Sequence, residues 1–300
     1  MKAIVTGGAG FIGCHIVDAL LEKGYDVHIV DNFAGGKKEE RINDKATYHE
    51  VDIRNLDVLK KVFEGATYVF HTAALPRMQF SIDDPAQTHE VNVTGTLNVL
   101  IAAHDAGVKK VVYSASSSAY GDQATMPLEE TMLPNPQSPY GLHKYFGECY
   151  CRVWYEVYGL PTVSLRYFNV YGSRHDPEGG YALVIGKFLK QRREGKPLTI
   201  YGDGSHSRDF THVDDIVRAN ILAAESENVG KGEVLNTGAG NNVSINALAE
   251  MIGGDVEHVK PRMEPMHSLA DTTRAKQLLD WEPQLTIEEG IEQLKQEYLA

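Results

Sequence analysis

Short hydrophobic runs alternate with segments of helical periodicity through the first half of the chain. The runs predict β-strands at residues 2–6, 27–30, 46–51, 68–70, 111–114 and 162–166. Between them, the spacing of hydrophobic residues predicts helices at residues 11–23, 55–64, 85–106 and 139–158. Continuous apolar strands separated by helices indicate a parallel sheet covered on both faces. The pattern therefore predicts a doubly wound α/β fold, which binds ligands at the carboxyl ends of its strands.

The pattern changes after residue 172. Residues 173–180 form a loop rich in glycine, proline and charge, and shorter elements follow it: helices at 181–193, 213–224, 272–279 and 287–298, and a strand at 198–201. We predict that residues 1–172 form the doubly wound domain and that residues 173–300 form a smaller α/β substrate-binding lobe. Segments near residues 205–240 are expected to return to the first domain.

Composition and charge narrow the class of protein. Of 300 residues, 42% are hydrophobic and 23% are charged, which excludes disordered and collagen-like classes. Twenty-nine basic and 41 acidic residues give a net charge of −12, so nucleic acid and anionic membranes are poor partners. No hydrophobic run approaches the ~18–20 residues of a membrane span. A strand starting at residue 2 leaves no space for a signal peptide, and three cysteines suggest no disulfide framework. We expect a soluble cytoplasmic protein.

Four glycines separate the first predicted strand from the first predicted helix. Gly7, Gly8, Gly10 and Gly13 satisfy the dinucleotide-binding fingerprint and its close variant. Glycine is needed where the chain turns sharply, lets its backbone approach a pyrophosphate and packs a helix tightly on the sheet. The helix N-terminus then offers free N–H groups to the phosphates. Glycines that merely end a strand are the competing interpretation.

An acidic residue strengthens the interpretation as a dinucleotide site. Asp31 ends the second predicted strand 18 residues after Gly13, close to the position of a carboxylate that accepts ribose hydroxyls. A carboxylate there repels a 2′-phosphate, so the sequence favours NAD over NADP. Lys37 and Lys38 lie nearby and keep NADP open, although a solvated loop also explains them.

A tyrosine and a lysine have the spacing of an acid–base pair. Tyr140 and Lys144 are four residues apart on a predicted helix, so both project from one face. A tyrosine with a pKa of about 10 is a poor base, but an ammonium together with a cationic nicotinamide would stabilise its phenolate. A serine run at 114–118 follows a strand, where one hydroxyl would hydrogen-bond the reacting oxygen. A surface pair and an ordinary serine-rich loop are the alternatives.

Further motifs are spread along nearly the whole chain. They are Gly-Gly-Ala-Gly-Phe-Ile-Gly (7–13), Asp31-Asn32, Asp52-Ile53, His71-Thr-Ala-Ala, Asn92-Val-Thr-Gly-Thr, Ser116, Tyr140-x-x-x-Lys144, Arg166-Tyr-Phe-Asn-Val-Tyr-Gly and Tyr201-Gly-Asp-Gly-Ser-x-Ser-Arg-Asp-Phe-Thr-His-Val-Asp-Asp. Together they resemble the extended short-chain dehydrogenase/reductases, and within that family they are most similar to the UDP-glucose (UDP-galactose) 4-epimerases. The resemblance implies a Rossmann domain at 1–172 that binds NAD, and a UDP-sugar as substrate.

The resemblance also implies a mechanism. Tyr140 takes the proton of the sugar C4 hydroxyl while hydride passes from C4 to NAD. Lys144 binds the nicotinamide ribose and lowers the tyrosine pKa, and Ser116 shares the hydrogen bond to O4. The 4-keto sugar turns over and receives the hydride on its other face, so NAD is expected to stay bound. The implied cofactor contacts are Gly7, Gly10, Phe11, Ile12, Gly13, Asp31, Asn32, Asp52, Ile53, Ala73, Ala74, Asn92, Tyr140, Lys144 and Tyr167.

The same resemblance assigns a substrate end. The implied contacts are Ser116, Ser117, Asn169, Val184, Thr199, Tyr201, Arg208, Arg262 and Ser268. Arginine suits the geometry of a diphosphate, so Arg208 and Arg262 are expected on the pyrophosphate. Asn169 is expected on a phosphate or sugar oxygen, and Thr199 and Tyr201 near the nucleobase. Serine at position 268, beside the C2 substituent, leaves volume for an N-acetyl group, so tolerance of UDP-GlcNAc and UDP-GalNAc is a hypothesis.

Ser117 and Ser118 bear on the choice of reaction. Relatives that dehydrate or decarboxylate nucleotide sugars carry acidic residues just after the catalytic Ser or Thr, whereas this chain has serines. We therefore predict an epimerase, which is an isomerase, and disfavour a 4,6-dehydratase or a decarboxylase. Another nucleotide-sugar oxidoreductase and a non-catalytic NAD-binding sensor are the remaining alternatives.

The sequence predicts no metal site, and only the family resemblance bears on the oligomeric state. His71, His206 and His212 do not have metal-ligand spacing. The predicted helices 85–106 and 139–158 carry broad apolar faces, and the resemblance implies a homodimer built as a four-helix bundle. Packing within one subunit explains these faces equally well.

Overall fold

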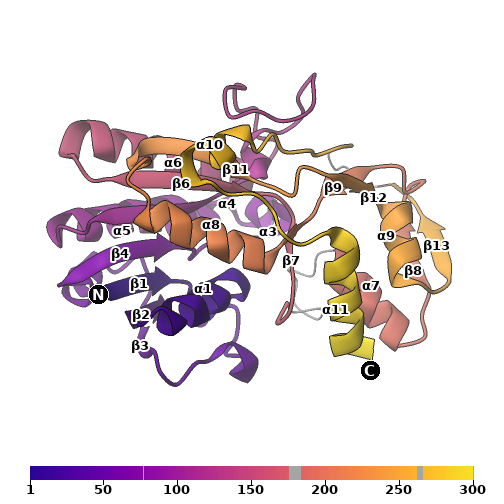
Figure 1. Cartoon of the computed structure of the whole chain (residues 1–300), viewed down its shortest axis with the longest axis horizontal. Helices are drawn as coiled ribbons and strands as arrows, with labels where there is room; N and C mark the ends of the chain where they lie inside the picture. Colours follow the sequence, from indigo (N-terminus) through magenta and orange to yellow (C-terminus); the bar gives the residue numbers. More distant parts are fainter. Residues whose placement is uncertain (77, 176–183, 262–265, 300) are drawn as a thin grey trace.

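A seven-stranded parallel sheet forms the centre of the larger lobe (Figure 1). The computed structural model describes residues 1–76, 78–175, 184–261 and 266–299. The strands, in spatial order, are β11 (Lys231–Thr237), β6 (Thr162–Tyr167), β5 (Lys110–Ser116), β4 (Ala66–His71), β1 (Lys2–Thr6), β2 (Asp26–Asp31) and β3 (Thr47–Glu50). The order reverses between β1 and β4, so the carboxyl ends of these strands border the crevice of a doubly wound sheet. The predicted fold class is confirmed.

Helices cover both faces of this sheet. One face packs against α1 (Phe11–Glu22), α8 (Val213–Glu225) and α10 (Thr273–Leu279). The other packs against α2 (Leu56–Phe63), α5 (Gly95–Asp105) and α6 (Pro139–Tyr158). Three shorter elements precede α5: α3 (Met78–Asp83), α4 (Pro85–His89) and a π-helical turn, Glu90–Thr94. The helix predicted at 85–106 is helical from Pro85 to Asp105, with the π-turn as an irregularity within it.

The smaller lobe has its own hydrophobic core, at the right in Figure 1. Its helices are α7 (Val184–Arg193), α9 (Ile245–Ile252) and α11 (Ile287–Leu299). Its paired strands are β8 (Leu198–Tyr201) with β13 (Val256–Val259), and β9 (Ser207–Asp209) with β12 (Asn242–Ser244). The short strands β7 (Val170–Tyr171) and β10 (Thr211–His212) pair next to the large sheet. Segments of the second half, α8, α10 and β11, lie on or in that sheet, and the predicted boundary at residue 172 stays a prediction.

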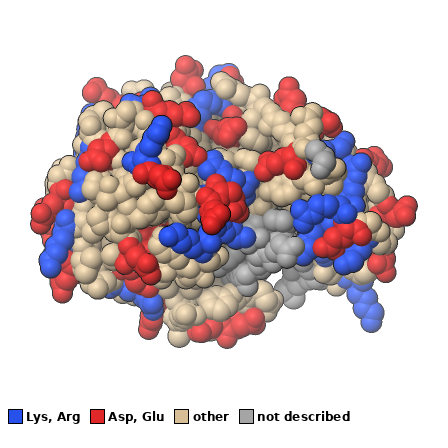
Figure 2. Space-filling view, turned by 90° about the horizontal axis from the view of Figure 1, so that it is seen from below, with Lys and Arg blue, Asp and Glu red and all other residues tan. Residues whose placement is uncertain are grey.

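The surface carries both signs of charge. On the face seen in Figure 2, acidic and basic side chains are interspersed, so the net charge of −12 is not gathered in one region of that face. Within the described ranges, no helix has the length and apolar character that crossing a membrane requires. The cytoplasmic location stays a prediction.

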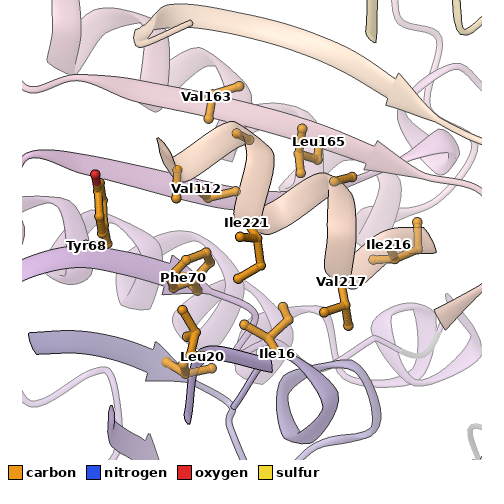
Figure 3. Packing of buried hydrophobic residues seen from close by; sticks show 14 of the residues in the cluster. Ile16, Leu20, Tyr68, Phe70, Val112, Val163, Leu165, Ile216, Val217 and Ile221 are labelled. Carbon is orange, nitrogen blue, oxygen red and sulfur yellow. The ribbon is translucent and has the colours of Figure 1, made fainter. Parts of the chain in front are cut away.

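Alternation along the strands builds the two cores. Val111 faces the core under α5 and α6, whereas Val112 faces the core under α1 and α8. Figure 3 shows the second of these cores, in which Ile16 and Leu20 of α1 meet Ile221 of α8 above the sheet. Burial of apolar surface on both faces fixes the strands relative to one another, because each buried side chain contributes about 1.5–3 kcal/mol. The carboxyl edge of the sheet is therefore a rigid platform for the polar residues that follow each strand.

Candidate active site

The glycine bend after β1 is closed by backbone contacts. Gly7 has a φ of +71°, its N–H donates to the Val30 carbonyl oxygen (2.8 Å), and its own carbonyl accepts from Gly10 N–H (3.0 Å). A Cβ on Gly13 would lie 2.1 Å from the Gly7 oxygen, so only glycine fits there. Helix α1 begins immediately after Gly10, and its first N–H groups have no intrahelical acceptor. This arrangement fits the pyrophosphate of a dinucleotide.

Acidic side chains follow β2 and β3 at the same edge. Asp31 accepts hydrogen bonds from the N–H groups of Ala9 (3.0 Å) and Phe33 (2.8 Å), and burial raises its pKa. The Asp31 carboxylate therefore ties the glycine bend to the end of β2. Asn32 donates to Asp52 (2.9 Å), whose pKa falls to about 2 because the Arg54 guanidinium binds it. Ionised carboxylates at this edge are suited to accept hydroxyl donors.

The segment after β4 is fixed from two sides. His71 is buried, hydrogen-bonds with Thr6 (2.7 Å) and Thr96 (2.9 Å), and burial lowers its pKa to about 3, so it is neutral. Asn92, in the π-turn, binds both the N–H (2.7 Å) and the carbonyl (3.0 Å) of Leu75. Ala73 and Ala74, two of the predicted cofactor residues, lie in this segment, and the Ala73 N–H donates to the Thr6 hydroxyl (3.3 Å). Ile53, another predicted cofactor residue, packs against Gly95.

Ser116, Tyr140 and Lys144 come together at the end of β5. Helix α6 starts at Pro139, and the Ser138 hydroxyl caps it by accepting from Gly141 N–H (3.1 Å). This cap places Tyr140 in the first turn of α6, where Ser116 lies close enough to influence the pKa of its hydroxyl. Lys144, one turn later, is buried and donates to the Ser114 carbonyl oxygen (2.7 Å). Strand β5 thus binds Lys144 and brings Ser116 close to Tyr140.

Burial shifts the pKa values of these groups in opposite directions. It raises the pKa of Tyr140 to about 12, with the Ser116 hydrogen bond partly opposing the shift. It lowers the pKa of Lys144 to about 8, and the charge of Glu148 opposes that shift. In the protein without NAD, the pKa of Tyr140 is therefore raised, whereas the sequence predicts that it is lowered. The reason is that desolvation outweighs the opposing effect of Ser116, while the Lys144 ammonium donates to the Ser114 carbonyl.

Tyr167 takes part in a buried network beside this group. Its hydroxyl is hydrogen-bonded to the Ser114 hydroxyl (2.9 Å) and donates to Asn220 (3.0 Å). Burial raises the pKa of Tyr167 to about 12. Tyr167 and Lys144 therefore both contact Ser114, and the predicted contact of Tyr167 with the cofactor stays a prediction.

Two of the predicted substrate residues meet where the lobes join. Asn169, at a φ of +31°, donates to the Asp209 carbonyl (2.9 Å) and to the Ser268 hydroxyl (3.3 Å). The Ser268 hydroxyl also accepts from Asp209 N–H (3.2 Å).

Ser117, the neighbour of Ser116, begins a short 3₁₀ turn.

The remaining predicted substrate residues lie in the smaller lobe. The Gln191 side chain donates to the Thr199 hydroxyl (2.7 Å) and accepts from the Thr199 backbone N–H (3.1 Å). Lys187 of α7 lies 4.9 Å from the centre of the Tyr201 ring. Val184 is the first residue of α7, and Arg208 of β9 donates to the Ser207 carbonyl (2.9 Å). Arg262 lies outside the described residues.

Asp209 and the pair Glu148–Arg166 are polar groups near the site that we did not predict. Asp209 is fully buried and accepts three backbone N–H bonds, from Ala239 (2.7 Å), Gly240 (3.1 Å) and Ala270 (2.9 Å). Burial raises its pKa to about 6. Both Arg166 and Asp209 stand inside motifs quoted above, and Glu148 has the i+4 spacing from Lys144, which is the signal that would have found it. Across the described ranges, no three potential metal ligands gather.

A dinucleotide-type glycine bend and a Ser–Tyr–Lys group at one edge of a parallel sheet define an enzyme of the short-chain dehydrogenase class. The sequence model of the NAD dependent epimerase/dehydratase family matches residues 3–238. The chain belongs to this family, which confirms the predicted family, the epimerase type of enzyme and NAD as the cofactor.

Three known proteins illustrate the similarity. A putative UDP-glucose 4-epimerase of Methanocaldococcus jannaschii is 38% identical over 97% of this chain and 96% of its own length. The structure of a Thermotoga maritima UDP-glucose 4-epimerase with UDP-glucose is 41% identical, covers 100% of this chain and 98% of its own, and has a TM-score of 0.93. A Bacillus cereus UDP-glucuronic acid 4-epimerase, solved with UDP-glucuronic acid and NAD, is 34% identical over 97% of each chain, with a TM-score of 0.89.

The close approach of Gly13 to Gly7 gives a test of the cofactor cradle. Gly13→Ala would push α1 away from the bend, and overpacking of this kind costs about 1–3 kcal/mol. If that cost falls on binding, titration calorimetry will show NAD affinity weakened about tenfold to a hundredfold. Gly35→Ala is the control, because a Cβ there has no neighbour within 4 Å. Unchanged NAD affinity in Gly13→Ala would contradict the cradle.

Proposed function

We propose that this enzyme interconverts the C4 epimers of a UDP-hexose, UDP-glucose and UDP-galactose, with Tyr140 as the base. The observation that carries the proposal is the meeting of Ser116, Tyr140 and Lys144 at the edge that also holds the glycine bend. Bound NAD supplies the hydride acceptor at C4 and a positive charge beside Tyr140.

Each residue of the group has a distinct task. Tyr140 takes the proton of the C4 hydroxyl, for which its phenolate must be favoured against burial. Ser116, at the end of β5 near Tyr140, shares the hydrogen bond to O4. Lys144 binds the nicotinamide ribose and contributes the charge that favours the phenolate. Because hydride leaves and returns at the same carbon, the reaction needs no external reductant.

The residues after Ser116 support epimerisation over elimination. Ser118 donates its hydroxyl to Ser116 (2.8 Å), so a hydroxyl rather than a carboxyl group stands beside the reacting position. A 4,6-dehydratase needs an acid and base for elimination. The similarity to both UDP-glucose and UDP-glucuronic acid epimerases leaves the sugar open. We propose the plain hexose, with Arg208 and Arg262 on the pyrophosphate, Thr199 and Tyr201 near the nucleobase, and Asn169 on a phosphate or sugar oxygen. Ser117 and Val184 are further proposed substrate contacts.

We also propose a homodimer, supported by an apolar stripe on α6. Leu142, Phe146 and Val153 are each 37% exposed and Val157 is 65% exposed, and their spacing places them along one side of the helix. Exposed apolar residues in a continuous row are typical of an interface between subunits. Helix α5 packs beside α6 and would complete a four-helix bundle.

Replacing the base tests the proposed reaction. The wild-type enzyme is expected to convert UDP-galactose into UDP-glucose without added reductant, as followed by chromatography. Tyr140→Phe lowers kcat by about 10²–10⁴-fold, because it removes general acid–base catalysis. Tyr145→Phe, on the same helix, keeps full activity.

Other outcomes would identify other functions. An active Tyr140→Phe variant rules out the tyrosine as base. Consumption of NAD(P)H identifies a reductase, and a 4-keto-6-deoxy product identifies a dehydratase. Bound NAD with no turnover of any nucleotide sugar identifies a sensor.

Substitution at position 268 tests the N-acetyl hypothesis. The wild-type enzyme is expected to turn over UDP-GlcNAc and UDP-GalNAc as well as the plain hexoses. Ser268→Tyr fills the space beside C2 and lowers kcat/KM for the acetylated pair by at least about tenfold relative to the plain pair. Ser268→Ala, which adds no volume, keeps the ratio. Refusal of the acetylated sugars by the wild-type enzyme would end the hypothesis.

A charge in the stripe tests the dimer. Phe146→Asp is expected to convert the dimer to a monomer in light scattering after size-exclusion chromatography, because an unpaired buried charge is costly. Val256→Asp, at an exposed apolar residue of β13, leaves the dimer intact. A monomeric wild-type enzyme, or a Phe146→Asp dimer, contradicts the interface.

A further inference from the structure

A buried ion pair lies one helical turn beyond Lys144. Glu148 follows Lys144 by four residues on α6, and only 3% of its surface is exposed. Arg166 of β6 binds both carboxylate oxygens of Glu148, through Nε (2.8 Å) and Nη2 (2.6 Å). Two-point binding of this kind fixes the carboxylate in position and orientation. A buried pair is not explained by stability alone, because its desolvation cost often exceeds its Coulombic gain.

Strand register places this pair directly beside the catalytic group. Arg166 is paired with Ala115, which lies between Ser114, the acceptor for Lys144, and Ser116, the partner of Tyr140. The guanidinium of Arg166 also lies 4.3 Å from the centre of the Tyr120 ring, whose hydroxyl donates to Asn236 (2.7 Å). The pair is therefore braced on the side away from Lys144. Glu148 cannot move without disturbing β6 or α6.

Few of the titratable groups around Lys144 carry a charge at neutral pH. His71 has a pKa of about 3, so it is neutral, and burial raises the pKa values of the neighbouring tyrosines. Glu148 and Arg166 are the charged members of this set. The groups that face Lys144 are His71 from β4, Tyr113 from β5, Arg166 and Tyr167 from β6, and Tyr140 and Glu148 from α6.

We infer that Glu148 is a positioning residue for the proposed reaction: fixed by its bidentate bond to Arg166 one helical turn from Lys144, its carboxylate keeps Lys144 protonated as an ammonium. Without the carboxylate, two buried cations, Lys144 and Arg166, would remain on neighbouring elements with no anion between them. Lys144 would then lose its proton at lower pH, and the neutral amine would no longer favour the Tyr140 phenolate. This inference rests on the proposed function for its consequence in catalysis, but the charge state of Lys144 is measurable by itself.

Glu148→Gln in the NAD-bound enzyme tests the role. An opposite charge nearby shifts a pKa by about one unit or more, so the titration midpoint of Lys144 is expected to fall by about one pH unit. The basic limb of the kcat–pH profile falls by the same amount, so the loss of kcat is about tenfold greater near pH 8.5 than near pH 6.5. A merely structural defect would lower kcat by one factor at every pH. NMR of 13Cε-lysine follows Lys144, and its resonance is assigned from its loss in Lys144→Arg.

Matched variants complete the experiment. Glu156→Gln removes a carboxylate from the same helix, where it forms an exposed pair with Arg152 (3.9 Å), and is expected to leave the profile unchanged. Glu148→Asp keeps the charge and restores the basic limb. Arg166→Gln leaves the Glu148 carboxylate to Lys144 and shifts the midpoint upward, so the sign of the effect is testable even if Glu148→Gln does not fold.

The two proposals fail on different observations. If the wild-type enzyme interconverts no UDP-hexose, the proposed function fails, and the NMR titration still decides the role of Glu148. An unchanged Lys144 midpoint in Glu148→Gln, or a downward shift in Arg166→Gln, overturns the inference even where epimerisation is observed.

Discussion

The arrangement of the site depends on the hydrogen bond from the buried Lys144 ammonium to the Ser114 carbonyl. The ammonium joins α6 to β5 through the Ser114 carbonyl (2.7 Å), in a place where burial lowers its pKa to about 8. A buried charge persists only when nearby groups compensate for lost hydration. The carbonyl, the Tyr113 ring 5.2 Å away and the Glu148 charge supply that compensation here. Helix α6 can therefore approach the sheet closely, and Gly147 gives the Tyr113 ring the necessary space.

The glycine bend and the Ser–Tyr–Lys group are brought together by the same topology. Parallel strands end at one edge, so the bend after β1 and the serine run after β5 border one crevice although they are far apart in sequence. Strand pairing of β1 with β4 and of β4 with β5 keeps both parts in register, and His71 of β4 also hydrogen-bonds to Thr6 of β1 and Thr96 of α5. Because these contacts are buried, a cofactor seated on the bend would meet side chains whose positions are already fixed.

Local patterns were enough to predict six of the seven strands of the sheet, since apolar runs mark buried strands, but not β11. The four-residue spacing of Tyr140 and Lys144 marks one helix face, and their catalytic role stays a prediction. Contacts between residues that lie far apart in the sequence could not be predicted from local patterns. The π-turn within the predicted helix 85–106 places Asn92 against Leu75, and nothing in its own sequence shows that contact. The Glu148–Arg166 pair was missed because Glu148 lies on α6 and Arg166 on β6, although the i+4 spacing from Lys144 places Glu148 on the same helix face. Family resemblance supplied the substrate end, including Arg262, which lies outside the described residues.

Catalysis and substrate choice are held by different kinds of structure. Ser116 and Lys144 belong to elements packed into the main cores, so their positions change only if the cores change. The substrate end depends instead on hydrogen bonds among Asn169, Asp209 and Ser268, which come from three segments far apart in the chain. A single side chain there can alter the volume beside the sugar without moving β5 or α6. Relatives named for UDP-glucose and for UDP-glucuronic acid match this chain over nearly its whole length, so the fold by itself does not set the sugar.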